Sequence, residues 1–426
     1  MNHIEYIEHE SFNLTDNAEL KNFFLCKIRE RLNPPSLKEV RLMGMDYDFR
    51  KDEFFMAYYI GADWIDVEKQ KAVVVLPKIK SVDFQTMLMK CFTCDKASEN
   101  LNQVFFIRME DKPIEMDSSS FQIEPLLIVY FINLVNRIVR KGLKSGYIIR
   151  EERLNGKIKG KVMMSQYVKH GFALGMKEMV DCRYHENNID CVENRIIKSA
   201  LLYCQQMIHR TQKGLGQHLA QLQNMYNSAM SAFEKVTAFV SLQELQHIHL
   251  NSLFKEYREA IPLAKMIIKK RGCCVEYEKN GTKYKFPPFI IDMPVLFERY
   301  VYALLDEAYG KSILYQIGTR ADRPDFLKPD EHLIIDAKYI TGWKDNINTD
   351  NVRQLSGYAR SIGIRHRLHI SDENAVCPCM IIYPDVNGIT SFSPVSAMNS
   401  NNNIHPIDGY IQFFKVGVSL PVVHSD

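Results

Sequence analysis

The sequence contains no apolar stretch long enough to cross a lipid bilayer. Its longest apolar run, Pro125–Ile132, is followed at once by Asn133 and Asn136, whereas a membrane-spanning helix needs about 20 apolar residues. The first residues are polar and acidic, and they lack the basic and apolar segments of a secretory signal. We therefore expect a cytoplasmic protein without a membrane segment.

A regular cysteine framework and a strong net charge are also missing. The 10 cysteines are irregularly spaced, which is typical of reduced cytosolic thiols rather than of disulfides. Cys91 and Cys94 form a CxxC and Cys377 and Cys379 a CxC, but a structural zinc site usually needs two such pairs at compatible spacing. We interpret these thiols as buried or incidental. The net charge of +3 permits nucleic-acid binding without indicating it.

The composition that remains is that of a folded, multidomain protein. Hydrophobic residues make up 46% and charged residues 25% of the 426 residues, which suggests two or three globular domains. Only the Ser/Asn-rich stretch Ser396–Asn403 indicates disorder. We predict a multidomain α+β protein with an N-terminal α+β domain (1–145), a strand-rich segment followed by a helical stalk (146–270), and a C-terminal α/β domain (271–426).

These domains are predicted from hydrophobic periodicity and turn signals. The N-terminal domain is expected to have strands at Phe54–Ile60, Ala72–Leu76 and Val104–Met109 and a helix at Pro125–Lys141. The middle region is expected to have a strand-rich stretch at Gly146–Met164 and helices at Glu193–Thr211, Gly216–Lys235 and Ser252–Lys270, the first preceded by a capping box at Asp190–Glu193. The C-terminal domain is expected to have helices at Pro294–Ala308 and Asp350–Ser361 and strands at Ile313–Thr319, Asp325–Leu327, His332–Tyr339, Met380–Tyr383 and Tyr410–Val416. Strands interleaved with helices predict a sheet with helices packed on it.

Two of these C-terminal strands carry a set of residues suited to phosphodiester hydrolysis. Asp325 begins one short strand, and Asp336 and Lys338 lie on the next, where positions i and i+2 share a face. A hairpin between the strands would bring Asp325 beside Asp336. Mg²⁺ prefers such oxygen ligands, and a bound divalent cation polarises a phosphate and lowers the pKa of a water. Lys338 would then orient or activate the attacking water, while a structural Asp–Lys bridge is the alternative interpretation.

Four further residues extend this predicted site. Glu298 lies in the first or second turn of the helix before the sheet and is a candidate for the metal shell. Gln354 and Tyr358 are four residues apart on the helix after the lysine strand and hence share one face, from which they could contact DNA or brace the site. Ala337 faces away from its neighbours and is small enough to pack against a helix. It is counted with Asp325, Asp336 and Glu298 among the candidate metal-site residues.

At these residues, and in the region before them, the sequence resembles the McrC family, the nuclease subunits of McrBC 5-methylcytosine-specific restriction systems. The resemblance extends over about residues 140 to 360, and the first 140 residues match only loosely. Its motifs are RLNGKIKGK at Arg153–Lys161, RYHEN at Arg183–Asn187, ENRIIKSAL at Glu193–Leu201 and DMPVLFERY at Asp292–Tyr300.

The resemblance implies a nuclease of the PD-(D/E)xK superfamily, with Asp325, Asp336 and Lys338 in its catalytic positions. It also implies a partner, an McrB-like AAA+ GTPase that recognises methylated double-stranded DNA and on whose ring McrC-like subunits dock and stimulate GTP hydrolysis. The chain itself has no G-x4-G-K-[ST] motif and is not expected to bind GTP alone.

Two other functions stay open. One is a stand-alone repair nuclease, because the Gln-x-x-x-Tyr pattern also occurs in RecB-like nucleases. The other is a non-catalytic adaptor that stimulates a GTPase, although the complete set of Asp325, Asp336 and Lys338 favours a nuclease. A neighbouring gene that encodes an AAA+ GTPase would favour the restriction function.

The middle region also contains polar motifs of its own. Lys157, Lys159 and Lys161 alternate at strand period, and together with Arg153 they could contact DNA phosphates or an acidic surface of the partner, or form a solvated strand face. Capping and fold-defining contacts are the preferred role for the polar residues in Arg183–Asn187, which include His185, and for Asn194–Arg195.

Overall fold

The protein folds into two compact units, which are described separately. The computed structural model describes residues 2–14, 21–22, 24–25, 39–79, 82–92, 94, 97, 103–108, 111–117, 123–210, 219–240, 254–273, 283–318, 323–340, 349–392 and 404–422. One unit comprises residues 1–126 and 280–426, and the other residues 127–279. The predicted disorder at Ser396–Asn403 lies outside the described residues. The fold is mixed α/β and multidomain, as predicted.

The N-terminal part of the first unit is built on a five-stranded sheet with the order β1-β6-β5-β13-β7. Its strands are β1 (Asn2–Ile7), β5 (Tyr59–Asp66), β6 (Lys71–Leu76), β7 (Phe105–Ile107) and β13 (Phe289–Asp292). The β-branched run of β6 is buried on both faces, as expected for a strand inside a sheet. A second, three-stranded sheet contains β2 (Ser11–Phe12), β3 (Asp46–Asp48) and β4 (Glu53–Phe55).

The structure differs from the predictions for this part in two places. The expected strand Phe54–Ile60 is two strands in different sheets, because β4 ends at Phe55 and β5 begins at Tyr59. Helix α2 (Phe84–Phe92) was not predicted. The 3-10 helix η1 (Leu42–Gly44) contributes Leu42 and Met43 to the buried cluster of this part. The Leu42 N–H donates to the buried carboxylate of Asp63.

Two C-terminal strands belong to N-terminal sheets rather than to the sheet that follows them. Strand β13 pairs with β5 on one side and with β7 on the other. Strand β12 (Lys283–Phe286) pairs with β8 (Ile114–Asp117). The expected boundary at residue 271 therefore does not separate the two parts of the first unit, because the buried strand β13 supplies the ladder hydrogen bonds that β5 and β7 need.

The C-terminal part of this unit is a six-stranded mixed sheet with the order β14-β15-β16-β17-β19-β18. Its strands are β14 (Leu314–Tyr315), β15 (Phe326–Lys328), β16 (Leu333–Ala337), β17 (Cys379–Ile389), β18 (Ile404–Pro406) and β19 (Phe413–Val418). Short 3-10 turns η5 (Gly310–Ser312) and η6 (Pro329–Glu331) precede β14 and join β15 to β16. The predicted order of strands is thus present, but β14 and β16 are shorter than predicted.

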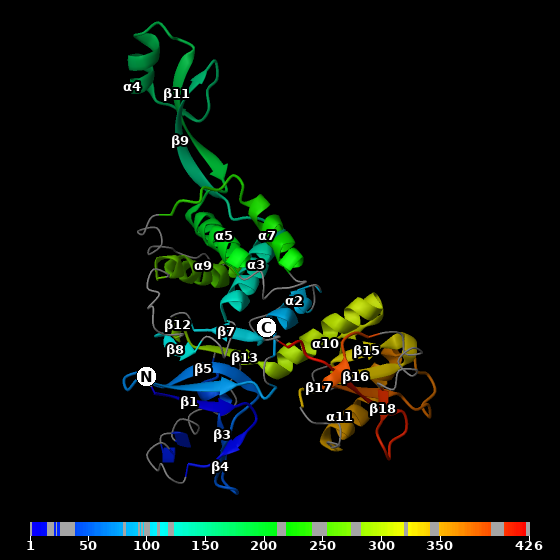
Figure 1. Cartoon of the computed structure of the whole chain (residues 1–426). Coiled ribbons are helices and arrows are strands. Elements are labelled where there is room, and N and C mark those ends of the chain that lie inside the picture. The colour runs from blue at the N-terminus through cyan, green and yellow to red at the C-terminus, as the bar shows by residue number, and fades with distance from the viewer. Residues whose placement is uncertain are drawn as a thin grey trace. The chain divides into compact units, whose positions relative to one another are not determined.

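Helices cover both faces of this sheet. Helix α10 (Met293–Tyr309) lies on one face and α11 (Thr349–Arg360) on the other, with β15, β16 and β17 between them in Figure 1. Helix α12 (Ile362–Arg367) follows α11 and was not predicted. The buried cluster on the α11 face contains Leu327, Ile334, Val352, Leu355, Ile364, Cys379 and Ile381. This cover on both faces explains why β16 is almost continuously apolar.

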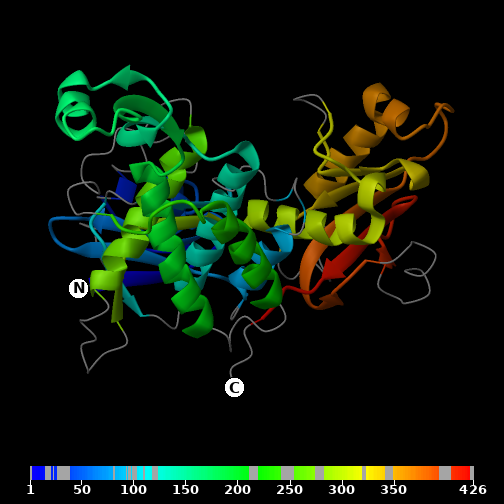
Figure 2. The same cartoon turned by 90° about the horizontal axis from the view of Figure 1, so that it is seen from above.

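The second unit combines helices with a long β-hairpin arm. The helices are α3 (Ile123–Lys141), which begins before the unit boundary, α5 (Val192–Arg210), α7 (Leu219–Ala232) and α9 (Lys255–Cys273). The arm consists of β9 (Gly146–Asn155) and β11 (Met179–Asn188), with β10 (Lys161–Val162), α4 (Met164–Tyr167) and the turn η3 (Val168–Phe172) at its far end in Figure 1 and Figure 2. The expected strand-rich stretch Gly146–Met164 is therefore two strands that are separated by a loop.

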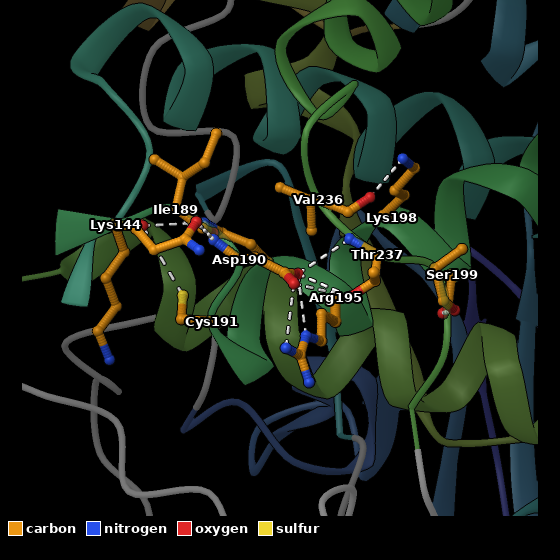
Figure 3. Close-up of polar contacts among 12 residues, drawn as sticks. Lys144, Ile189, Asp190, Cys191, Arg195, Lys198, Ser199, Val236 and Thr237 are labelled. Carbon is orange, nitrogen blue, oxygen red and sulfur yellow. Dashed lines mark hydrogen bonds and ion pairs between the residues drawn. The ribbon is translucent and has the colours of Figure 1, made fainter. Parts of the chain in front are cut away.

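Asp190 fastens the start of α5 to the segment after α7. Its carboxylate accepts two hydrogen bonds from Arg195 and further bonds from the main chain and hydroxyl of Thr237. Figure 3 shows this carboxylate between the two residues, with the Lys198 ammonium directed at the Val236 carbonyl nearby. The predicted capping box is wrong in detail. Helix α5 begins at Val192, two positions after Asp190. The Asp190 carboxylate accepts from the Arg195 side chain instead of acting as the N-cap of the helix.

Two further findings concern membrane spans and cysteines. No helix there is long and apolar enough to cross a membrane. The described cysteines are free thiols, and Cys91, Cys94, Cys377 and Cys379 are buried. Burial raises the pKa of Cys91 and of Cys379 to about 12, so both thiols stay protonated at neutral pH.

Candidate active site

Helix α10 is fixed at its first turn and carries Glu298 into the region of the predicted site. Asp292 is its N-cap, and its Oδ1 accepts a hydrogen bond of 3.0 Å from the Val295 N–H, which satisfies one of the free donors at a helix start. Burial raises the pKa of Asp292 to about 6. Glu298 follows in the second turn of α10.

The predicted hairpin between the two short strands is present. Strands β15 and β16 pair in antiparallel fashion, with Phe326 opposite Ile335. Asp325 directly precedes β15 and therefore comes level with Asp336 in β16. The main-chain N–H of Ala337 donates a hydrogen bond of 2.8 Å to Oδ2 of Asp325. Both acidic side chains thus lie at one end of the sheet.

Lys338 lies at the point where the strand leaves the sheet. Its main-chain N–H still donates to the Ile382 carbonyl, and the Ile340 N–H then turns back onto the Lys338 carbonyl. The Lys338 ammonium lies 2.7 Å from Oδ2 of Asp336, whose side chain is 2% exposed. Alternation along the strand places Asp336 and Lys338 on the same face, as the sequence predicted.

Burial raises the pKa of all three acidic groups, and repulsion between acidic groups adds to this at Asp325 and Glu298. Burial and then repulsion from Asp336 and Glu298 hold the pKa of Asp325 well above its usual range. Burial raises the pKa of Asp336 against the opposing effect of Lys338, and burial with repulsion from Asp336 raises the pKa of Glu298. Like charges in a low-dielectric site cannot all ionise without a compensating cation. The cluster therefore has the electrostatics of a cation site.

Lys338 responds in the opposite sense. Burial alone would lower the pKa of its ammonium, but the neighbouring Asp336, followed by Asp325, raises the pKa above its usual value. The side chain consequently stays positively charged at neutral pH. A charged ammonium can orient a water or stabilise negative charge on a phosphate, but it cannot accept a proton.

Gln316 is a site residue that the sequence did not reveal. Its main-chain N–H donates 2.7 Å to the Asp325 carbonyl, and its side-chain amide donates 2.6 Å to Oε1 of Glu298. Its own Oε1 accepts from Arg323. The residue has a φ of 47°, a left-handed conformation that costs a non-glycine residue on the order of 1 kcal/mol. No local sequence pattern marks this position, since its role depends on which two acidic residues lie on either side.

The predicted Gln-x-x-x-Tyr pair lies on one face of α11. The Gln354 amide donates 2.9 Å to the Tyr358 hydroxyl, with Gln354 exposed. Tyr358 is close enough to Lys338 to affect its pKa. The pair therefore borders the lysine side of the site, and its exposed amide is available to a ligand.

The donor set fits Mg²⁺ in one specific arrangement. Among the described residues, no three His, Cys, Asp or Glu side chains converge closely enough to hold a metal ion by themselves. Two carboxylates with waters and substrate oxygens are, however, an ordinary Mg²⁺ site. Oδ2 of Asp336 is buried beside the Lys338 ammonium, which lies 2.7 Å away, so one positive charge is already present next to the three acidic side chains. Asp325 and Asp336 fit as the ligands, with Glu298 held beside them by Gln316.

The basic residues of the middle region are placed differently from the prediction. Lys157 and Lys159 lie in the loop between β9 and β10, and Lys161 begins β10, so the three do not form one strand face. Glycines at both ends of the loop have positive φ and break the strand. Lys159 covers the Tyr184 ring at 3.9 Å, and Arg153 pairs with Asp181 at 3.0 Å within the arm.

The polar motifs after the arm have the fold-defining role that the sequence favoured. Asn194 is fully buried, and its amide donates to the main-chain carbonyls of Lys144 and Ile189. Its own oxygen accepts from the Tyr257 hydroxyl at 2.7 Å. His185 is exposed on β11 and belongs to no metal-binding group of the described residues.

Comparison with known families decides where this chain belongs. The family model described as McrBC 5-methylcytosine restriction system component matches residues 56–367. The chain belongs to this family. The resemblance seen in the motifs is thereby confirmed, and the match extends into the N-terminal part, where the motifs were only loosely similar. No curated protein matches the chain.

Two solved structures resemble this McrBC family member distantly. One is a refined half-complex from the tetradecameric assembly of Thermococcus gammatolerans McrB AAA+ hexamers with bound McrC, which is 16% identical with a TM-score of 0.38, over 98% of this chain and 94% of that chain. The other is the cryo-EM structure of the Thermococcus gammatolerans McrBC complex, with 16% identity and a TM-score of 0.31, over 71% of this chain and 87% of that chain.

Proposed function

We propose that this McrBC family member is a Mg²⁺-dependent DNA endonuclease of the PD-(D/E)xK type, with Asp325, Asp336 and Lys338 as catalytic residues. The observation that supports it most is the meeting of the buried Asp336 carboxyl, the partly buried Asp325 carboxyl and a charged lysine at one end of a mixed sheet. Glu298 on the covering helix and Gln354 on the opposite helix border the same place. A structural Asp–Lys bridge explains the ion pair but gives no role to Asp325 and Glu298, which lie partly buried at the same site.

Each residue then has a chemical role. A bound divalent cation supplies the positive charge that polarises the phosphate and lowers the pKa of a water. Asp325 and Asp336 would hold it, with the Ala337 main chain fixing the orientation of Asp325. Lys338, which stays protonated, would orient the attacking water or stabilise charge that develops on the phosphate. The Gln354 amide, exposed on α11, would contact the DNA backbone.

We further propose that cleavage requires an McrB-like AAA+ GTPase that recognises methylated double-stranded DNA. Family membership and the missing nucleotide-binding motif support this division of labour. The arm offers a docking surface, because its far end exposes a group of large apolar side chains. They are Ile158, Met164, Val168, Phe172, Leu174 and Met176. Exposed apolar groups of this kind mark interaction sites.

The test combines the purified chain with an McrB-like AAA+ GTPase from the same organism. We expect double-stranded methylated DNA to be cut only with both proteins, GTP and Mg²⁺, and we expect chelation to stop cutting until Mg²⁺ is restored. Cutting by the chain alone without nucleotide would instead identify a stand-alone repair nuclease. Stimulation of GTP hydrolysis with no DNA cutting under any of these conditions would identify a non-catalytic adaptor.

A further inference from the structure

Glu8 is a buried acidic residue to which the proposed catalysis gives no role. It follows strand β1, is 1% exposed, and its Oε2 has no hydrogen-bond partner among the described residues. Its Oε1 accepts two hydrogen bonds, from the Lys78 main chain at 2.9 Å and from the Tyr339 hydroxyl at 2.7 Å. A buried carboxyl is costly even when it is partly bonded. Its presence therefore calls for an explanation beyond packing.

The residue that Glu8 binds is the next one after Lys338. The two side chains have different partners, since the Lys338 ammonium contacts Asp336 of the candidate site and the Tyr339 hydroxyl donates to Glu8. Tyr339 is 4% exposed and packs against Phe297, the neighbour of Glu298, and against Tyr58. Burial raises the pKa of the Tyr339 hydroxyl above its usual value, so the hydroxyl remains a donor at neutral pH.

The end of β16 needs such an anchor. Its last ladder hydrogen bond is the one from the Lys338 N–H to Ile382, after which the Ile340 N–H bends the chain back onto Lys338. Rotation of the backbone at this point would swing the Lys338 ammonium away from Asp336. The Tyr339 side chain belongs to the next residue along the chain, and holding its hydroxyl in place at Glu8 restricts that rotation.

We propose that Glu8 is a positioning residue for the nuclease site, which acts through its hydrogen bond to Tyr339 to hold Lys338 against Asp336. The N-terminal strand β1 thus completes a site whose reacting groups all lie in the C-terminal part. The inference rests on the proposed function, because it assigns Glu8 a role in that same reaction. It also explains why the buried acid lies at the end of β1, where the strand meets Tyr339.

The experiment compares variants that remove the hydrogen bond with variants that keep it. Tyr339→Phe removes the hydroxyl and keeps the ring, and Glu8→Leu removes the acceptor. Glu8→Gln keeps an oxygen that accepts from both Tyr339 and Lys78. Tyr58→Phe is the matched control, since it removes a hydroxyl that has no hydrogen bond to any described residue from the ring beside Tyr339.

We expect Tyr339→Phe and Glu8→Leu to lower kcat for DNA cleavage about tenfold, since small misplacements of catalytic groups have effects of this order or larger. KM for DNA and the partner's GTP hydrolysis should not change, because binding and docking are intact. Glu8→Gln and Tyr58→Phe should cut at the wild-type rate. Rescue by Glu8→Gln distinguishes positioning from general loss of structure, and thermal unfolding of each variant is measured alongside.

Three results would overturn the inference, and they are distinguishable. If the wild type cuts, Lys338→Ala does not, and Tyr339→Phe cuts normally, then Glu8 has only a structural role and the proposed nuclease function stands. If the wild type cuts under none of the conditions, the proposed nuclease function is wrong, and the positioning role of Glu8 is then wrong as well. Equal losses in Tyr58→Phe and Tyr339→Phe would also count against Glu8, because any change in the aromatic cluster would then suffice.

Discussion

The Ala337 main-chain N–H donates a hydrogen bond of 2.8 Å to Oδ2 of Asp325. This bond ties the acid at the start of β15 to the strand that carries Asp336 and Lys338. It also stabilises the ionised form of Asp325 against burial and against its acidic neighbours. The carboxylate is thereby held in one orientation before any cation arrives, and such preorganisation is what a metal site requires.

Removing Asp336 or Lys338 should abolish cutting without unfolding the protein. Asp336→Ala deletes a proposed metal ligand, and Lys338→Ala deletes the charge beside the attacking water. Each loss is commonly worth several kcal/mol in the transition state, so cleavage should fall about 10²-fold or more. Cleavage and partner GTP hydrolysis are measured in parallel, with Asp330→Ala, an exposed acid in the turn between the same strands, as the control. Undiminished cutting by folded Asp336→Ala would show that the active site lies elsewhere.

Substitutions at Gln316 can separate its side chain from its backbone. Gln316→Ala removes the amide that holds Glu298 and leaves a Cβ at a φ of 47°, whereas Gln316→Gly removes the same amide and suits that φ. We expect both variants to cut about tenfold more slowly, because Glu298 is released in each. The glycine variant should be more stable to heat than the alanine variant. Normal cutting by Gln316→Gly would mean that only the backbone conformation matters.

Charged substitutions at the end of the arm should break docking. Phe172→Asp combined with Leu174→Asp replaces two exposed apolar side chains, so the arm should stay folded while it loses the surface proposed to meet the GTPase. Pull-down and GTP hydrolysis should both fall by about tenfold or more. Lys177→Ala, on the same end of the arm, is the control. Full stimulation by the double variant would place docking elsewhere.

A deletion that ends the chain at residue 270 is unsuitable for the same question. It would remove β13, which pairs with both β5 and β7 in the N-terminal sheet. If such a fragment failed to dock, the damaged sheet would explain the result as well as a missing contact surface would.

The Asp190 connection should weaken in acid. Hydrogen bonds from Arg195, followed by those from Thr237, lower the pKa of Asp190 from 3.8 to about 2. A depressed pKa in the folded state means that the stabilisation is complete above about pH 4 and is lost as the pH falls through about 2. Allowing for solvent screening, it amounts to about 1–2 kcal/mol. Asp190→Asn should accelerate hydrogen exchange of the Thr237 amide at neutral pH, with a difference from wild type that shrinks towards pH 2. An exchange rate equal to wild type at neutral pH would contradict this role.

The sequence alone determined the parts of the site that depend on local periodicity. Alternation along a strand placed Asp336 and Lys338 on one face, and the short link before β16 implied the hairpin that brings Asp325 level with them. The helices α10 and α11 were predicted to within a residue or two at each end because their apolar positions repeat with the helical period. The prediction of one strand across β4 and β5 was wrong, because a continuous apolar run does not reveal where the chain passes from one sheet to another.

Only the tertiary structure decided which distant residues meet. Glu8 and Tyr339 are 331 positions apart, and β13 joins a sheet whose other strands lie far earlier in the chain. Gln316 gains its role because Asp325 and Glu298 lie on either side of it. A local sequence pattern predicts which face of a helix or strand is buried. It does not predict which distant residue will form a hydrogen bond with a buried polar group. That partner is set by packing, which joins segments regardless of their separation along the chain.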